Sequence, residues 1–306
     1  MMGRAEQSFD HLRPEIRQAL AWSTDRRIEQ VWSDSYIPYQ KAEKIISRIE
    51  GLRKRPKTIR PQNLLITGPA GNGKTAILNE YLKRHPCRES QDSKGHIRRD
   101  IRPVLLAQTP SSAGDNRILS AILKPLYPKD WDRGSTDAKM LRILNALDQC
   151  KVEILLLDEV NNMLGGGKRV WDSLRAIKSI SNEFKLPIVF AGTEDASFVV
   201  RQDPQLTTRI DPVALSEWSY GQEYVNFLSL FESTIPLEKP SNLYKQEKAN
   251  RILELSKGLD AFGRKGILFN IIKLLKGSAE AAISSGSEEI DPTILEKTAK
   301  ELANTG

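Results

Sequence analysis

The stretch NLLITGPAGNGKTAILNE, from Asn63 to Glu80, joins a short apolar run to a glycine-rich loop and the start of a helix. A continuous apolar run that leads into a helix is typical of a buried strand in a parallel sheet. The loop GPAGNGKT fits the pattern G-x-x-x-x-G-K-[ST], which cradles nucleotide phosphates. Its glycines let backbone N–H groups approach phosphate oxygens, and the following helix N-terminus adds further donors. The stretch therefore predicts an α/β fold that binds a nucleoside triphosphate.

The side chains that end this loop are expected to hold the nucleotide and its metal ion. Lys74 is placed to reach the β- and γ-phosphates, and the hydroxyl of Thr75 is placed to bind Mg²⁺. The cofactors that we expect are therefore ATP and Mg²⁺. The expected nucleotide-binding residues of the loop are Gly68, Pro69, Ala70, Gly71, Asn72, Gly73, Lys74, Thr75 and Ala76.

Three more continuous apolar runs follow along the chain, and each ends in a polar residue. They are PVLLAQT (103–109), EILLLD (153–158) and PIVFAGT (187–193). A fifth short strand is expected in IDPVAL, directly after Arg209, and beyond Leu215 only helical patterns remain. We therefore expect a P-loop α/β fold, with a parallel-sheet αβα core and a C-terminal helical lid domain.

Before the phosphate loop the chain is polar and helical in character. YQKAEKIISRIEGLRK places apolar residues on one face of an amphipathic helix, and Pro56 ends it. The predicted organisation is a helical lead-in over 1–60, a nucleotide-binding core over 61–215 and a helical lid over 216–306.

An acidic pair ends the run ILLLDE. Asp158 would lie at the carboxyl edge of the sheet, where it can help to hold Mg²⁺. Glu159 follows it and is placed to orient or deprotonate the attacking water. Thr193 ends the run PIVFAGT, which we expect beside the acidic strand, where its hydroxyl can position the γ-phosphate or the water; a plain polar strand end is the alternative.

Three arginines are candidates for contacts with transition-state charge. Arg209 ends the segment RQDPQLTTR, and Arg201 lies eight residues earlier. An arginine supplied by a neighbouring subunit can stabilise phosphoryl transfer, although either residue can also serve as a surface ion-pair partner. Arg264, in FGRKG, begins a lid helix and is a candidate for reaching back to the γ-phosphate.

The formal charge of +7 favours polyanionic partners, nucleic acid first. No apolar run approaches the roughly 20 residues of a membrane helix, and the N-terminus lacks a signal-peptide core, so we expect a cytoplasmic protein without a membrane partner. The two cysteines and three histidines show no metal-ligand spacing.

Three polar segments are candidates for phosphate contacts with DNA. Two are helix starts and one is glycine-rich, and the alternative for each is an ordinary helix cap. Their candidate residues are Asn116, Arg117, Ser135, Thr136, Lys139, Lys168 and Arg169. The basic run RKRPKTIR (53–60) is either a solvated linker or a contact for DNA or another partner.

The phosphate loop, LLLDE, FAGT and DPQLTTRI, followed by a helical lid, together resemble an AAA+ ATPase. More narrowly, the lead-in IPYQKAEKIISRIEGLRKRPKTIRPQNLLITG, the segment GTEDASFVVRQDPQLTTRI and the lid end resemble the TniB/TnsC group of transposition regulators. The resemblance covers about residues 25 to 300. Asn161 departs from the group, because many of its sequences carry a histidine after the acidic pair, and GGGKR is unusually rich in glycine.

The resemblance implies an ATPase that assembles on duplex DNA as a ring or helical filament, with ATP between neighbouring subunits. It also implies recruitment or activation of a DDE-type transposase, with a TniQ-like target-selection protein as a further partner. The regions around Asn116 and Ser135 would face the DNA, and Ile37 or Tyr39 would pack on the adenine unless they only dock a helix on the core.

Two other classes of function stay open at this point. One is another DNA-associated AAA+ machine, such as an origin-recognition-type loader. The other is a signalling or secretion-linked NTPase with no DNA role.

Overall fold

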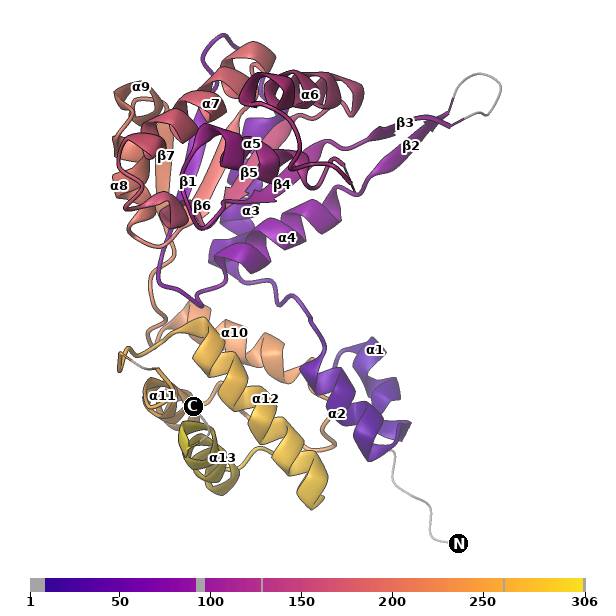
Figure 1. Ribbon diagram of the computed structural model, residues 1–306. Coiled ribbons are helices and arrows are strands. Elements are labelled where there is room, and N and C mark those ends of the chain that lie inside the picture. Colours follow the sequence, from indigo (N-terminus) through magenta and orange to yellow (C-terminus); the bar gives the residue numbers. More distant parts are fainter. Residues whose placement is uncertain (1–8, 92–96, 128, 261, 305–306) are drawn as a thin grey trace, which may run out of the picture. The chain divides into compact units, whose positions relative to one another are not determined.

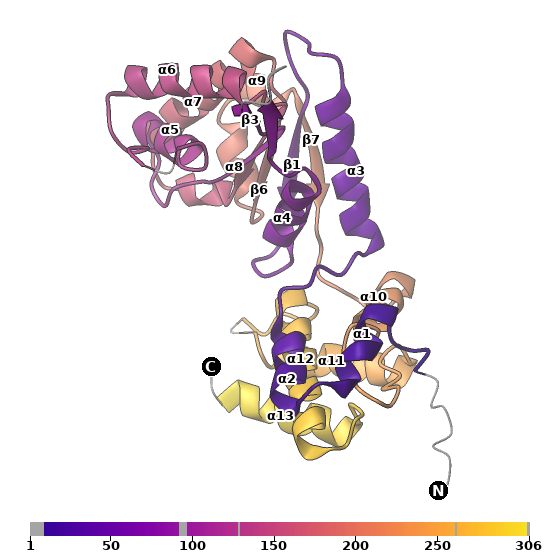
Figure 2. The same cartoon turned by 90° about the vertical axis from the view of Figure 1, so that its right-hand side faces the viewer.

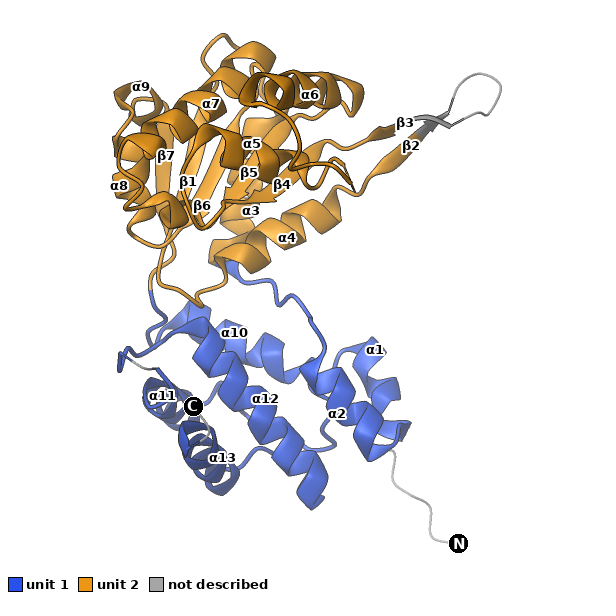
Figure 3. Ribbon diagram, viewed as in Figure 1, with its two compact units in different colours: residues 1–40, 217–306 blue, residues 41–216 orange. Residues whose placement is uncertain are grey.

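The computed structural model describes residues 9–91, 97–127, 129–260 and 262–304. The chain divides into two compact units: residues 41–216 form one, and residues 1–40 with 217–306 form the other (Figure 3). The lead-in expected over 1–60 is thus shared between the units. The terminal residues 1–8 and 305–306 lie outside the described residues.

A five-stranded parallel sheet forms the centre of the unit 41–216, in the order β4-β5-β6-β1-β7. The strands are β1 (Asn63–Thr67), β4 (Val104–Gln108), β5 (Ile154–Asp158), β6 (Ile188–Gly192) and β7 (Ile210–Ala214). All five strands expected from the apolar runs are therefore present. β5 and β6 are buried along their whole length, whereas β7 is an exposed edge strand that tolerates Pro212.

Helices cover both faces of this sheet (Figures 1 and 2). α3 (Gln40–Lys54) and α4 (Lys74–Arg84) lie on one face, and α5 (Asp115–Leu123), α6 (Thr136–Gln149) and α7 (Lys168–Phe184) on the other. Short helices η2 (Val160–Met163), α8 (Ala196–Arg201) and α9 (Pro204–Thr207) follow β5 and β6. The expected αβα core is confirmed.

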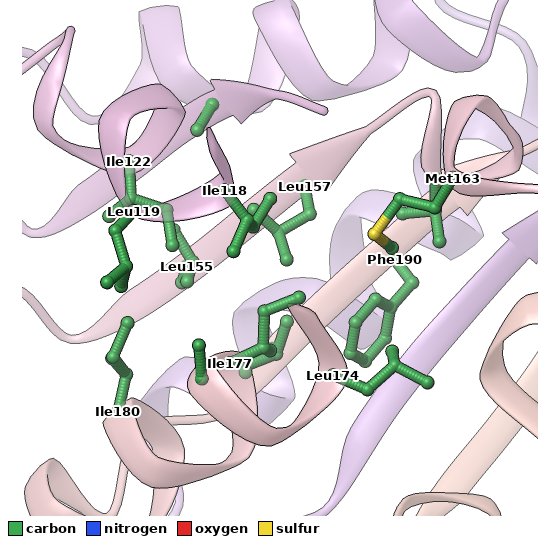
Figure 4. Close-up of a cluster of buried hydrophobic side chains, with 14 of the residues drawn as sticks. Ile118, Leu119, Ile122, Leu155, Leu157, Met163, Leu174, Ile177, Ile180 and Phe190 are labelled. Carbon is green, nitrogen blue, oxygen red and sulfur yellow. The ribbon is translucent and has the colours of Figure 1, made fainter. Parts of the chain in front are cut away.

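Side chains alternate along each strand, and one set of them forms the main core on the α5–α7 side. Leu155, Leu157 and Phe190 from the sheet pack against Ile118 of α5 and Ile177 of α7 (Figure 4). All five side chains are fully buried. This packing holds the carboxyl ends of β4, β5 and β6 side by side, and these ends carry the polar residues of the candidate site.

A hairpin outside the sheet is not predicted from the sequence. β2 (Arg88–Gln91) and β3 (Ile97–Ile101) pair antiparallel, apart from the main sheet. Both strands are rich in charged residues, so they carry no apolar run of the kind that reveals a strand.

The second unit is helical and is built from both ends of the chain. Its elements are α1 (Pro14–Arg17), η1 (Gln18–Ala21), α2 (Thr24–Trp32), α10 (Gln222–Glu232), α11 (Gln246–Lys257), α12 (Leu268–Ser285) and α13 (Pro292–Asn304). Arg27 of α2 ties the two ends together, because its guanidinium pairs with Glu288 and donates to the carbonyl oxygen of Pro236. The expected helical lid therefore includes N-terminal residues that the sequence places far away.

Candidate functional site

The glycine-rich loop runs from the carboxyl end of β1 to the first turn of α4. Gly71 and Gly73 have φ of 76° and 89°, a region that favours glycine. A Cβ on Gly68 would lie 2.3 Å from the carbonyl oxygen of Leu215, so only glycine fits there. Asn72 is buried and its amide donates to the carbonyl oxygens of Leu215 and Ser216, at 3.0 and 2.8 Å. The loop is thus fastened to the end of β7.

Lys74 lies buried beneath this loop. Its ammonium donates to the carbonyl oxygens of Gly68 at 2.7 Å and Pro69 at 2.8 Å. Burial lowers the pKa of Lys74, although the carboxylates of Glu194, Asp158 and Glu159 act in the opposite direction. Among the described residues this buried cation donates to carbonyl oxygens alone, which makes it a favourable place for a phosphate anion.

Thr75, from the glycine-rich loop, and Asp158, from the acidic pair, lie in direct contact. The Thr75 hydroxyl donates to Oδ2 of Asp158 at 2.7 Å, and the Glu159 backbone N–H donates to Oδ1 at 2.9 Å. Burial raises the pKa of Asp158, while these two bonds and the Lys74 ammonium oppose that rise. The pair fits Mg²⁺, because this ion takes oxygen ligands and uses only one or two from the protein beside the nucleotide phosphates.

Glu159 adopts a left-handed backbone conformation, with φ 55° and ψ 41°. Its Oε2 accepts from the side-chain amides of Gln108 at 2.7 Å and Asn162 at 3.0 Å. Gln108 ends β4 and lies opposite Asp158 in the register of the neighbouring strand, and Asn162 also donates to the carbonyl oxygen of Thr109 at 3.3 Å. Two amides therefore hold the carboxylate of Glu159.

Sequence reasoning missed both of these amides. Gln108 had a usable signal, because it is the last residue of an apolar run and the ends of parallel strands share one edge. Asn162 had none, since its position in the short helix η2 follows from how the chain turns after Asp158.

Thr193 follows β6, which lies between β5 and β1, so it stands between the acidic pair and the glycine-rich loop. Its backbone N–H donates to Oδ1 of Asn161 at 3.0 Å. The same Asn161 oxygen would lie 2.5 Å from a Cβ on Gly192, so the asparagine packs directly on the strand. Asn161 thereby links the turn after Asp158 to the position of Thr193.

Arg209 lies at the amino ends of the strands, opposite the carboxyl ends that carry the glycine-rich loop and Asp158. It immediately precedes β7, and its carbonyl oxygen accepts from the N–H of Asn63, the first residue of β1. Its guanidinium donates to Asn182 at 3.1 Å. Arg201 is exposed at the end of α8. Because β1 runs from Asn63 toward the glycine-rich loop, Arg209 is separated from its own loop by the length of the strand.

Three further predicted residues belong to the helical unit. Arg264 is held by Asp260, whose pKa it lowers, through a bond of 3.1 Å. Ile37 and Tyr39 are buried, and the ring of Tyr39 lies 5.0 Å from that of Trp218. The Tyr39 hydroxyl has no hydrogen-bond partner among the described residues.

The predicted DNA contacts divide into buried and exposed groups. Lys139 is buried, and its ammonium donates to Asn116 at 2.6 Å and Ser120 at 2.7 Å. Within the described ranges no carboxylate pairs with Lys139, and burial lowers its pKa. The guanidinium of Arg117 is exposed and donates to Ser112.

The remaining candidates in this set are helix starts. Ser135 caps α6 by accepting from Ala138 N at 3.3 Å, and Thr136 is the first residue of that helix. Lys168 and Arg169 are exposed at the start of α7.

A cavity of about 1000 Å³ opens beside these groups. It is bordered by Asn116, Arg117 and Lys139 as well as by Gln108 and Glu159. The buried Thr109 hydroxyl, also in its wall, has no hydrogen-bond partner among the described residues. The structure therefore places three of the predicted DNA-facing residues, Asn116, Arg117 and Lys139, in one cavity with the amides that hold Glu159.

Across the described residues, no helix is both long and apolar enough to span a bilayer. The same residues contain no group of three or more histidine, cysteine or acidic side chains that could bind a metal ion.

Comparison with solved structures gives the fold. Orc1 of Aeropyrum pernix, solved in complex with DNA, has a TM-score of 0.55 at 18% identity, covering 90% of this chain and 69% of that chain. Cdc6p from Pyrobaculum aerophilum has a TM-score of 0.59 at 19% identity, with coverages of 90% and 71%. RuvB of Thermotoga maritima has a TM-score of 0.50 at 15% identity, with coverages of 89% and 72%. At these identities the likeness shows the fold alone, and it confirms the P-loop AAA+ fold.

Comparison with protein families is more specific. Among curated proteins no relative matches the sequence. Residues 27–220 match the family described as bacterial TniB protein, a range that runs from α2 through the whole sheet. The resemblance noted from the motifs is thereby confirmed: the chain belongs to the TniB family.

Proposed function

We propose that this protein is an ATP-hydrolysing regulator of DNA transposition that assembles on duplex DNA. The observation that carries the proposal is the match to the TniB family over residues that contain the glycine-rich loop, the acidic pair and Arg209. In this proposal the protein stays bound to DNA while ATP is bound, and hydrolysis of the ATP releases the protein from the DNA.

The nucleotide would bind where the glycine-rich loop and Lys74 converge. Its phosphates would accept from the backbone of the loop and from the Lys74 ammonium, which exchanges the carbonyl oxygens of Gly68 and Pro69 for phosphate oxygens. Thr75 and Asp158 would hold Mg²⁺, which neutralises charge on the transferred phosphoryl group. The sequence-based assignments of Ile37 or Tyr39 to the adenine and of Arg264 to the γ-phosphate remain part of the proposal.

Glu159 is assigned as the residue that orients the attacking water and accepts its proton. Its carboxylate is engaged by Gln108 and Asn162, and this supports a resting arrangement in which hydrolysis is slow. Thr193, which stands between the acidic pair and the loop, would position the γ-phosphate or the water.

We assign Arg209 to the nucleotide site of a neighbouring subunit. Its place at the amino end of β7, away from its own glycine-rich loop, supports a role in trans. Its guanidinium is held only by the neutral amide of Asn182 in the described part of the chain, so little is lost when it turns to a phosphate. Arg201, exposed at the end of α8, is the second candidate.

DNA would be held through its phosphates by the starts of α5, α6 and α7. Asn116, Arg117, Ser135 and Thr136 offer exposed or half-exposed polar groups, and Lys168 and Arg169 add charge. Lys139 is too deeply buried for direct contact, so we assign it to orienting Asn116 and to the positive potential of the surface. The Orc1 structure in complex with DNA shows that a chain of this fold can bind DNA, which supports the assignment.

The proximity of this surface to Gln108 supports a link between DNA and hydrolysis. Gln108, Glu159, Asn116 and Arg117 border one cavity. A phosphate that draws Arg117 and Asn116 outward would reshape the cavity that Gln108 also borders, and so weaken the hydrogen bond from Gln108 to Glu159. The partners that would read the assembled state are a DDE-type transposase and a TniQ-like target-selection protein.

The test is electron microscopy of the protein with duplex DNA and a slowly hydrolysed ATP analogue. Rings or filaments are expected that require both DNA and nucleotide, with DNA affinity that falls steeply with salt and varies little with sequence. Strong sequence preference without polymerisation would favour an origin-recognition-type loader. Absence of assemblies together with no mobility shift at low salt would contradict any DNA role and favour the signalling class.

A further inference from the structure

A second cavity, of about 860 Å³, lies in the sheet unit at the edge away from the nucleotide site. Its walls include Gln62, Glu153 and Pro187, which directly precede β1, β5 and β6. The glycine-rich loop and Asp158 lie at the other ends of these parallel strands, about 16 Å away for a strand of this length. In Figure 2 the loop that joins α3 to β1, which forms one wall, lies at the upper end of the sheet.

This cavity, which we call the amino-edge pocket, carries an uncompensated positive charge. Its single carboxylate, Glu153, pairs with Arg53, which also pairs with Glu50 at 2.7 Å. Arg53 in turn holds the pKa of Glu50 well below its usual value, as expected for a tight ion pair. Four other basic residues line the pocket and have no side-chain bond or ion pair to any residue that the structure describes: Arg55, Lys57, Arg60 and Lys185.

The loop that carries three of these charges is stiff and also apolar. Pro56 and Pro61 fix their own φ angles and disfavour helical conformations of the residues before them, Arg55 and Arg60. Between the prolines, the side chain of Ile59 is 78% exposed. A loop of restricted conformation loses little entropy when it binds a ligand.

We propose that the amino-edge pocket binds an acidic segment of a partner protein, with an apolar side chain of that segment packed on Ile59. The volume matches a few side chains, since binding cavities of about 300–1000 Å³ are typical. The uncompensated lysines and arginines complement carboxylates, as in the recognition of acidic motifs by basic clusters. A DNA duplex is a poorer fit. Its convex polyanionic surface binds to extended, polar protein faces, whereas this pocket is concave and partly apolar.

The probe is a fluorescent nonapeptide, Gly-Glu-Asp-Leu-Leu-Glu-Asp-Glu-Gly, titrated against the full chain and followed by anisotropy. We expect saturable binding that weakens with salt, and at least about tenfold weaker binding by the triple variant Arg55→Glu/Lys57→Glu/Arg60→Glu. The matched control Lys44→Glu/Lys83→Glu/Arg175→Glu changes the net charge equally with exposed residues outside the pocket, and it should bind as the wild type does. Equal loss in the control would overturn the proposal.

Two further comparisons separate the occupants. Replacement of both leucines in the probe by glycine, or Ile59→Ser in the protein, should weaken binding several-fold; no change would overturn the role assigned to Ile59. A short duplex should not displace the peptide, and displacement that depends on the pocket charges would identify nucleic acid as the occupant and overturn the proposal. If the triple variant does not fold, the single variant Lys185→Glu provides the same test.

This proposal goes beyond the nucleotide and DNA functions. ATP binding should remain unchanged in the triple variant, and its assembly on DNA should match that of the control variant, which has the same net charge. Failure of the peptide experiment and failure of the proposed function are therefore distinguishable.

Discussion

Two sets of polar residues, one at each end of the parallel strands, differ in burial and in hydrogen bonding. At the carboxyl edge Lys74, Asp158 and Asn72 are buried and bonded within the protein. At the amino edge Arg55, Lys57 and Arg60 are exposed and engage nothing in the described structure. Burying charged groups costs free energy unless they are paired, so the carboxyl edge keeps a costly arrangement that is poised for chemistry. The amino edge keeps its charges available for another molecule.

This contrast predicts that substitutions at the carboxyl edge change nucleotide handling, and that substitutions of Arg55, Lys57 and Arg60 at the amino edge change only the binding of partners. Arg209, also at the amino end of the strands, is the exception, because we assign it to the nucleotide site of a neighbouring subunit. The largest effect is expected for Lys74→Ala. ATP at 100 times its Kd should stabilise the wild type by about 2.7 kcal/mol and the variant by nothing measurable in thermal melts. Lys83→Ala, on the exposed face of the same helix, is the control and should respond as the wild type does. A normal ATP response of Lys74→Ala would contradict the assigned site.

An effect on hydrolysis of at least comparable size is expected for Glu159→Gln, which keeps the shape of the side chain and removes its basicity. Hydrolysis should fall by about 10²–10⁴-fold, the usual contribution of a general base, while ATP binding stays intact. Assemblies on DNA should therefore persist longer, as measured by their decay after excess ATP is removed. If the variant hydrolyses ATP at the normal rate, the role assigned to Glu159 is wrong.

Asp158→Asn tests the electrostatic state of the carboxyl edge through pH. Burial raises the pKa of Asp158, so the folded protein binds a proton more tightly than the unfolded chain, and the wild type loses stability as pH rises through the folded value. Without nucleotide, Asp158→Asn should therefore be more stable than the wild type at neutral pH, and the difference should shrink as pH falls toward about 4.

The size of that difference follows from proton linkage, since each tenfold change in proton affinity corresponds to about 1.4 kcal/mol. Denaturant melts at several pH values measure it, with Asp172→Asn on α7 as the control. A variant that is less stable than the wild type at neutral pH would show that the carboxylate stabilises the fold. With ATP and Mg²⁺ present, the variant should lose the stabilisation that Mg²⁺ adds.

The smallest effect is expected for Gln108→Ala. If the amide holds Glu159 in a resting position, its loss should raise hydrolysis without DNA by roughly three- to tenfold, given a hydrogen bond to a charged group of about 1.5–3 kcal/mol that Asn162 partly replaces. The stimulation by DNA should shrink accordingly. A fall in basal hydrolysis would instead mean that Gln108 positions Glu159 for the reaction.

The elements that the sequence could predict are those with a local signal. The five strands and the residues of the glycine-rich loop were predictable, because continuous apolar runs and a fixed glycine spacing are local signals. Asp158 was predictable as the last residue of such a run. The hairpin of β2 and β3 was not, since its strands are charged and do not join the core.

Features that depend on contacts between distant parts of the chain were also not predictable from the sequence. The union of α2 with the lid helices depends on Arg27 meeting Glu288, 261 residues later. The amino-edge pocket collects residues from three separate loops, and its basic run alone left both a solvated linker and a contact for DNA or another partner open. The hydrogen bond from Gln108 to Glu159 depends on the register of β4 against β5.

The central claim is that each nucleotide site is completed by Arg209 of a neighbouring subunit on DNA, and mixing two inactive variants tests it most directly. Arg209→Ala retains Glu159, and Glu159→Gln retains Arg209, so a mixed interface can combine one of each. With random mixing in equal amounts, about a quarter of the interfaces should be complete, and DNA-dependent hydrolysis should return to about a quarter of the wild-type rate. A mixture no more active than the two variants measured separately would contradict a site shared between subunits.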